Sequence, residues 1–220
     1  NSSRNTVMAI QRGNDNEIDM DGSDGIMDDS DRNVVVLRQR GDDNEIEIDI
    51  AGDSNNNMIR VSQRGDDNEV DDIDARDGSD RNMGTIVQIG DDNDATTDFF
   101  DDSNDNVTSQ RQVGDDNDSD FDILDSNKNR VKVVQRGDDN DSDGWIEGDS
   151  DRNFVSTRQR GDDNDSDVYI YDNSNANTIY VNQRGEDHES DVEIDENSNR
   201  NYVDVWQRGE DQESDVDIDE

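Results

Sequence analysis

The sequence predicts an all-β solenoid, a cross-β ladder of nine strand-turn-strand rungs with about 24 residues in each. The phrase QRGDDN, or a close variant of it, recurs nine times, and its glycines are 28, 24, 25, 24, 23, 24, 24 and 24 residues apart. Alternate positions beside that phrase are apolar or β-branched, which is typical of strands with one buried face. The chain contains no Pro, the residue that cannot donate a hydrogen bond to a strand ladder.

The repeats divide the chain into rungs without an intervening linker, so a single repeat domain, 1–220, is expected. Rung boundaries are placed at the residue before an invariant Ser, which stands eleven positions before each repeat glycine. The first rung has four extra residues, which predicts a bulged loop between Met20 and Met27. The predicted rungs are 1–28, 29–52, 53–77, 78–101, 102–124, 125–148, 149–172, 173–196 and 197–220.

Each rung opens on a predicted strand between an invariant Asn and an invariant Gln, with alternate apolar residues such as Val131 and Val133. Stacked rungs place like residues ~4.8 Å apart. Inward Asn and Gln should then form amide ladders that join the rungs. Alternatively, the recurring Asn residues merely mark turns. Gln has no turn preference, so its recurrence at one position in every rung indicates a role in packing. The expected ladder residues are Gln11, Gln39, Gln63, Gln88, Gln112, Gln135, Gln159, Gln183 and Gln207; Asn5, Asn33, Asn57, Asn82, Asn106, Asn129, Asn153, Asn177 and Asn201; and Asn16, Asn44, Asn68, Asn93, Asn117, Asn140 and Asn164.

Two turns and a second strand complete the rung. The first turn is Gly-Asp-Asp, and the second is Asp-Ser-Asp or similar, as at Asp149-Ser150-Asp151. Glycine permits positive φ, and Asp, Asn and Ser hydrogen-bond the turn backbone. Between the turns, alternation such as Ser166, Val168 and Ile170 predicts the second strand. The turn glycines are Gly13, Gly41, Gly65, Gly90, Gly114, Gly137, Gly161, Gly185 and Gly209.

Composition limits the classes of function. A hydrophobic content of 26% and a formal net charge of -42 are by themselves typical of disorder, but a disordered tail has no reason to keep a fixed register. The absence of Cys excludes disulfides, Cys zinc sites and thiol catalysis. No apolar run approaches the ~18–20 residues of a membrane span. No basic face is expected either, so nucleic acid is not an expected partner.

The turns carry the candidate sites. Nine near-identical turns argue against a unique catalytic site, so no enzyme activity is expected. His188 occupies the second Asn column and is interpreted as a ladder substitute. Stacked acidic turns could bind Ca²⁺, which prefers oxygen ligands, or could simply be solvated; no other cofactor is expected. The candidate calcium ligands are Asp42, Asp43, Asp66, Asp67, Asp138, Asp139, Asp162 and Asp163.

The unit Asn-x-Val-x-Val-x-Gln-Arg-Gly-Asp-Asp-Asn resembles the curlin repeat, Ser-x5-Gln-x-Gly-x2-Asn-x-Ala-x3-Gln, over the whole chain. The family's opening Ser is Asn here, its Ala is Ser in rungs such as that of Ser142, and its closing Gln is apolar, as at Ile146. Curlins are subunits of curli, the extracellular amyloid fibres of bacterial biofilms. The resemblance implies a cell-surface fibre, export of the unfolded chain through an outer-membrane pore, and nucleation by a minor subunit.

The rungs at both ends carry no atypical capping repeat, so copies of the chain are expected to stack head to tail into a fibre. The surplus of acidic residues should slow aggregation and make it depend on salt. The main alternative is a monomeric, calcium-binding acidic β-solenoid that acts as an adhesin or matrix protein. An acidic disordered cation buffer is the third hypothesis.

Overall fold

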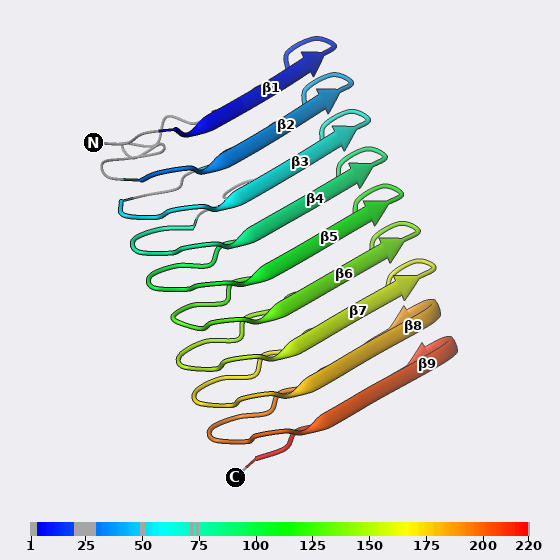
Figure 1. The fold of residues 1–220 in the computed structure, drawn as a ribbon. Helices are drawn as coiled ribbons and strands as arrows, with labels where there is room; N and C mark the ends of the chain where they lie inside the picture. Colours follow the sequence, from blue (N-terminus) through cyan, green and yellow to red (C-terminus); the bar gives the residue numbers. More distant parts are fainter. Residues whose placement is uncertain (1–3, 20–29, 49–51, 71–72, 74, 220) are drawn as a thin grey trace.

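The computed structural model describes residues 4–19, 30–48, 52–70, 73 and 75–219. In these residues the chain forms a flat ladder of parallel rungs with no helix (Figure 1), which confirms the predicted all-β solenoid. No described segment could therefore cross a membrane as an apolar helix. The predicted bulged loop between Met20 and Met27 lies outside the described residues. The strands are β1 (Thr6–Arg12), β2 (Val34–Arg40), β3 (Met58–Arg64), β4 (Met83–Ile89), β5 (Val107–Val113), β6 (Arg130–Arg136), β7 (Phe154–Arg160), β8 (Thr178–His188) and β9 (Tyr202–Gln212).

The strands form one parallel sheet in sequence order, from β1 to β9, and one strand falls in each predicted rung. Like residues face one another across each strand pair. Gln39 pairs with Gln63, for example, and Val131 pairs with Val155. Each side chain therefore lies in a column that runs along the ladder, and an invariant position in the sequence becomes a continuous row in space.

The core lies between the inner face of the sheet and the inner side chains of the second arm, which is the part of each rung between the two turns. Val131 and Val133 of β6 are buried on the sheet side. From the second arm, Phe99 fills the space opposite Gly84, where an added Cβ would lie 3.8 Å from the Phe99 ring. Burial of such apolar area contributes roughly 25 cal/mol per Å².

The second arm is less regular than the alternation of its residues predicts. Its first half bonds from rung to rung, as in the 2.9 Å bond from the Glu69 N–H to the Asn93 carbonyl. Its second half has left-handed backbone at apolar residues, with φ of 84° at Ile123, 110° at Ile146 and 97° at Ile170. Among the described residues of this arm, only two pairs are β structure, His188 with Gln212 at the start of the arm and the bridge between Asp19 and Glu47.

Candidate functional site

The second Asn column forms a ladder of side-chain amides. The Asn68 Nδ2 donates to Oδ1 of Asn44 in the preceding rung at 2.9 Å and to the carbonyl of Gly90 in the following rung at 2.8 Å. One side chain therefore joins three rungs. The amide-to-amide bond recurs along the column, in Asn44, Asn68, Asn93, Asn117, Asn140 and Asn164, and it begins on Asn16.

This ladder ends at Asn164, because His188 and then Gln212 follow in the same column. His188 is buried, with 1% of its surface exposed, as its interpretation as a ladder substitute requires. Both of its ring nitrogens and Oδ1 of Asn164 lack a hydrogen-bond partner among the described residues. The imidazole thus fills the column without replacing the amide donor.

The first Asn column bonds backbone rather than other amides. The Asn33 Oδ1 accepts from the Asn57 N–H at 2.8 Å, and the Asn33 Nδ2 donates to the Ser54 carbonyl at 2.6 Å. Both bonds point to the following rung, so the amide holds that rung at two points. The acceptor half of this arrangement recurs in Asn5, Asn33, Asn57, Asn82, Asn106, Asn129, Asn153 and Asn177, and the last of these accepts from Asn201.

The Gln column joins the strand to the second arm. The Gln63 Nε2 donates to the Asn68 carbonyl of its own rung at 2.8 Å and to the Glu45 carbonyl of the preceding rung at 2.7 Å. Only Gln11 and Gln39 are bonded amide to amide, at 2.9 Å, in the part of the chain that the structure describes. A buried Oε1 without a partner recurs in Gln63, Gln88, Gln112, Gln135, Gln159, Gln183 and Gln207.

Two further ladders were not foreseen from the sequence. The invariant Ser, which was assigned to the second turn, is buried, and the Ser54 N–H donates to Oγ of Ser30 at 3.1 Å. At the first turn, the leading Asp accepts from the rung before it, as Asp66 Oδ1 does from the Asp42 N–H at 2.7 Å. The signals that could have revealed both ladders were the invariant Ser and the recurrence of this Asp in six of the nine turns.

The turn glycines are required by both backbone conformation and space. Gly41 has φ of +136°, and a Cβ added there would lie 1.8 Å from the carbonyl oxygen of Gly65 in the next rung. A side chain cannot be accommodated at that distance. The glycine column therefore lets successive rungs approach closely enough for the backbone and Asn ladders to form.

Residues 55–98 match the family model of the curlin associated repeat. This segment is similar to a curlin repeat. The matched segment contains two sets of the columns described above, including Gln63, Gly65 and Asn68 from one rung and Gln88 and Gly90 from the next. A search of curated proteins finds no match to the chain.

The candidate calcium ligands at the first turns fall into two groups. The leading turn carboxylates, Asp42, Asp66, Asp138 and Asp162, each accept a backbone N–H from the preceding rung. The residues that follow them, Asp43, Asp67, Asp139 and Asp163, are exposed and left-handed. No cluster of three or more acidic or His side chains suited to a metal occurs in the described ranges. Calcium binding stays a prediction.

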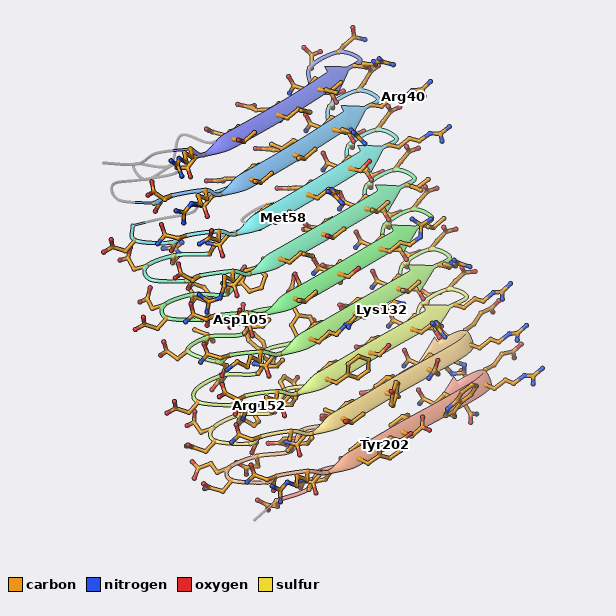
Figure 2. All side chains as sticks on the ribbon, in the orientation of Figure 1. Arg40, Met58, Asp105, Lys132, Arg152 and Tyr202 are labelled. Atoms are coloured by element: carbon orange, nitrogen blue, oxygen red, sulfur yellow. The ribbon has the colours of Figure 1, made fainter. Side chains whose placement is uncertain are left out.

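The outer face of the sheet is basic, although sequence reasoning expected no basic face. Strand alternation places thirteen of the chain's 20 Lys and Arg residues on this side. The nine strand segments that end at the residue before each turn glycine together contain one acidic residue, Asp204. Figure 2 shows two of these cations, Arg40 and Lys132, on their strands. We call this surface the basic face; its cations are Arg12, Arg38, Arg40, Arg60, Arg64, Arg111, Arg130, Lys132, Arg136, Arg158, Arg160, Arg184 and Arg208.

The opposite surface, formed by outward residues of the second arm, is acidic. Acidic residues occupy the fourth and sixth positions after each turn glycine, except that Thr96 stands at one of them. No described residue at these positions is Lys or Arg. We call this surface the acidic face; its described residues at those positions are Glu17, Asp19, Glu45, Glu47, Glu69, Asp94, Asp118, Asp120, Asp141, Asp143, Asp165, Asp167, Glu189, Asp191, Glu213 and Asp215.

Crowding on the acidic face alters protonation. Desolvation, followed by the charges of Asp141 and Asp167, raises the pKa of Asp143 to about 7. Desolvation also raises the pKa of Asp165 to about 7, with a further contribution from its hydrogen bond to Asp167. These carboxyl groups hold protons far more tightly than an isolated Asp, because they are partly desolvated and lie beside other carboxylates.

Proposed function

We propose that this chain is a structural subunit of extracellular curli-type amyloid fibres, in which copies join head to tail to build biofilm matrix and support adhesion. The curlin repeat supports this proposal. The observation that carries it is the repetition of one hydrogen-bonding pattern across every rung boundary, because the same pattern can continue across the boundary between two molecules.

The last rung presents the groups that a further rung would use. In the rung before it, the first strand residue donates to the first Asn of the next rung, as the Thr178 N–H does to the Asn201 carbonyl at 2.9 Å. The equivalent N–H of Tyr202 has no following rung among the described residues. Beside it, Val205, Val216 and Ile218 line an end hollow of about 500 Å³. The backbone edge and the apolar columns of this rung thus have no following rung among the described residues, and another copy could supply one.

The first rung presents the complementary edge. β1 pairs only with β2 among the described strands, and Val7 is 44% exposed although its counterpart in the next rung is fully buried. Val7, Ala9 and Gln11 occupy the columns that end at Val203, Val205 and Gln207. A head-to-tail contact of this kind uses two different surfaces, so it generates an open filament rather than a closed dimer.

The location and the further partners follow from the resemblance to curlins rather than from geometry. On that basis the chain is exported unfolded through an outer-membrane pore, and a minor subunit nucleates its assembly at the cell surface. The formal net charge of -42 opposes premature association, and salt at the outside of the cell would screen it.

The direct test is the behaviour of the purified chain. We expect filaments in electron micrographs, a thioflavin response and a meridional repeat of ~4.8 Å. Compact single particles at every salt concentration would contradict the proposal. Folding of a monomer only on addition of calcium would instead support the calcium-binding adhesin.

A capping variant tests the head-to-tail contact. Val205→Lys places a charge in the inner column of the last rung, where the Val205 side chain lines the end hollow, while the first rung stays intact. A small fraction of this variant should add to growing ends and stop them. Trp206→Lys is the matched control, because Trp206 points outward and is 74% exposed. Equal inhibition by both variants, or by neither, would exclude this contact.

A further inference from the structure

The basic face carries cations that have no carboxylate partner among the residues that the structure describes. A groove of about 410 Å³ across β5, β6 and β7 is lined by Arg111, Lys132, Arg136, Arg158 and Arg160. None of these side chains pairs with a carboxylate in the ranges that the structure describes. Along the edge of the face, the arginines that precede the glycines line a second hollow of about 590 Å³. The face is therefore a concentrated and uncompensated positive surface.

The acidic face carries an excess of carboxylates, and the charges of both faces recur with the period of the rungs. A cation column and a carboxylate column thus share the same ~4.8 Å spacing along the ladder. Two ladders laid side by side, with the basic face of one on the acidic face of the other, would keep their charges in step over any length. Phosphates of duplex DNA, one per 3.4 Å of rise on each strand, would not match this spacing.

Aromatic side chains lie on both faces. On the basic face, the rings of Phe154, Tyr180 and Tyr202 contact one another in succession, with centroids 5.4 and 5.9 Å apart. On the acidic face, Trp145 stacks on Tyr169 at 6.3 Å, and Trp145 is 39% exposed. Exposed aromatic rows of this kind contribute contact area where two surfaces meet.

We propose that the two faces are lateral docking surfaces for a second copy of this chain, so that filaments associate front to back, basic face on acidic face. This inference rests on the proposed fibre, whose uninterrupted columns make the contact additive along its length. Opposite charge alone would not specify the arrangement, but opposite charge in a common register does.

Salt provides the first test, since the faces attract while the whole molecules repel. At 0.01 M salt the Debye length is ~30 Å, so the full net charge should keep filaments apart. At 0.15 M it is ~8 Å, and the charges that face each other dominate; at 1 M it is ~3 Å, and that attraction is screened as well. Bundles should therefore be most abundant near 0.15 M. A steady increase in bundling up to 1 M would overturn the inference.

Matched variants provide the second test, read by electron microscopy of filaments at 0.15 M salt. Arg111→Gln, Lys132→Gln, Arg136→Gln, Arg158→Gln and Arg160→Gln together should leave filaments that no longer bundle. The control variant makes the same change in net charge at the second turn, away from both faces, and its filaments should bundle as those of the unaltered chain do. Its substitutions are Arg4→Gln, Arg32→Gln, Lys128→Gln, Arg152→Gln and Arg200→Gln.

A change on the acidic face separates docking from general repulsion. Asp141→Asn, Asp143→Asn, Asp165→Asn and Asp167→Asn together make the chain less negative, so nonspecific bundling would increase. Front-to-back docking predicts loss of bundles instead, and increased bundling would overturn it. Single cross-β filaments under all conditions would exclude lateral docking and leave the fibre intact. A complete absence of filaments would exclude both.

Discussion

At the scale of single residues, a departure from a column shows what the column residue contributes. Where Asn68 joins three rungs through its amide, His188 fills the same space with no hydrogen bond from its ring among the described residues. A buried acceptor that is left without a donor, such as Oδ1 of Asn164, typically lowers the stability of the fold by about 1–3 kcal/mol.

His188→Asn should therefore stabilise the ladder. The new amide can donate to Oδ1 of Asn164 and extend the row by one rung, with an expected gain of about 1 kcal/mol. The midpoint of guanidinium denaturation measures it. Gln212→Asn is the control, because Gln212 lies at the exposed end of the column. An unchanged or lower midpoint for His188→Asn would show that the imidazole already satisfies this site.

The turn glycines should tolerate no side chain. In Gly137→Ala, the new Cβ would lie 2.1 Å from the Gly161 carbonyl oxygen at a φ of +121°, so the rungs must move apart. We expect destabilisation of roughly 1–3 kcal/mol or more, with slower assembly. In Gly148→Ala, the closest atom is the end of the Asp172 side chain, so the effect should be small. Similar denaturation midpoints for the two variants would refute the steric argument.

The sequence predicted which residues form columns but not which atoms they bond. Invariant Asn and Gln predicted rung-to-rung amides, and the second Asn column has the expected amide-to-amide geometry. The Gln amide reaches backbone of the second arm instead, as Gln63 does to Asn68. That choice depends on how the two arms are offset across the core, which residue identity alone does not encode.

At the scale of elements, the alternation of residues predicted the strand of each rung correctly but predicted the second arm only in part. Alternation of mostly apolar or β-branched residues between Asn and Gln correctly predicted all nine strands, β1 through β9, on one sheet. The same alternation in the second arm predicted a strand, yet Ile146 and Ile170 have left-handed backbone there. Closing a rung of fixed length forces the arm to bend, and a two-residue period reports only which side chains face inward.

The strand itself can be tested with proline. Val133 lies in the centre of β6 and pairs with neighbours on both sides, so Val133→Pro removes an N–H from the sheet and should block assembly. Val133→Thr is the matched control, because Thr157 occupies the same column in the next rung. Thioflavin kinetics report the outcome, and normal elongation of Val133→Pro would disprove the strand register.

At the scale of the whole molecule, the charge on the acidic face makes stability depend on pH. The pKa of Asp143 and of Asp165 is raised to about 7, so the folded chain binds protons that the unfolded chain releases. Stability from these groups is fully present below about pH 4 and is lost as pH rises to about 7. The denaturation midpoint should therefore be higher at pH 5 than at pH 8.

Neutral variants locate this effect. Asp143→Asn with Asp165→Asn should raise the midpoint at pH 8 and flatten its dependence on pH between 5 and 8. Asp139→Asn with Asp163→Asn removes equal charge at the exposed first turn and should leave the slope largely unchanged. If both pairs flatten the curve equally, the total charge rather than the acidic face controls the dependence.

The uniform register from β1 to β9 has a consequence for variation in chain length. Because every pair of neighbouring strands keeps the same parallel register, removal of one whole unit, such as 149–172, would leave the first and last rungs unchanged. Shortened and full-length chains should then copolymerise without defects. In the proposed fibre, duplication or loss of single units would thus change the size of the subunit while the growth of filaments stays the same.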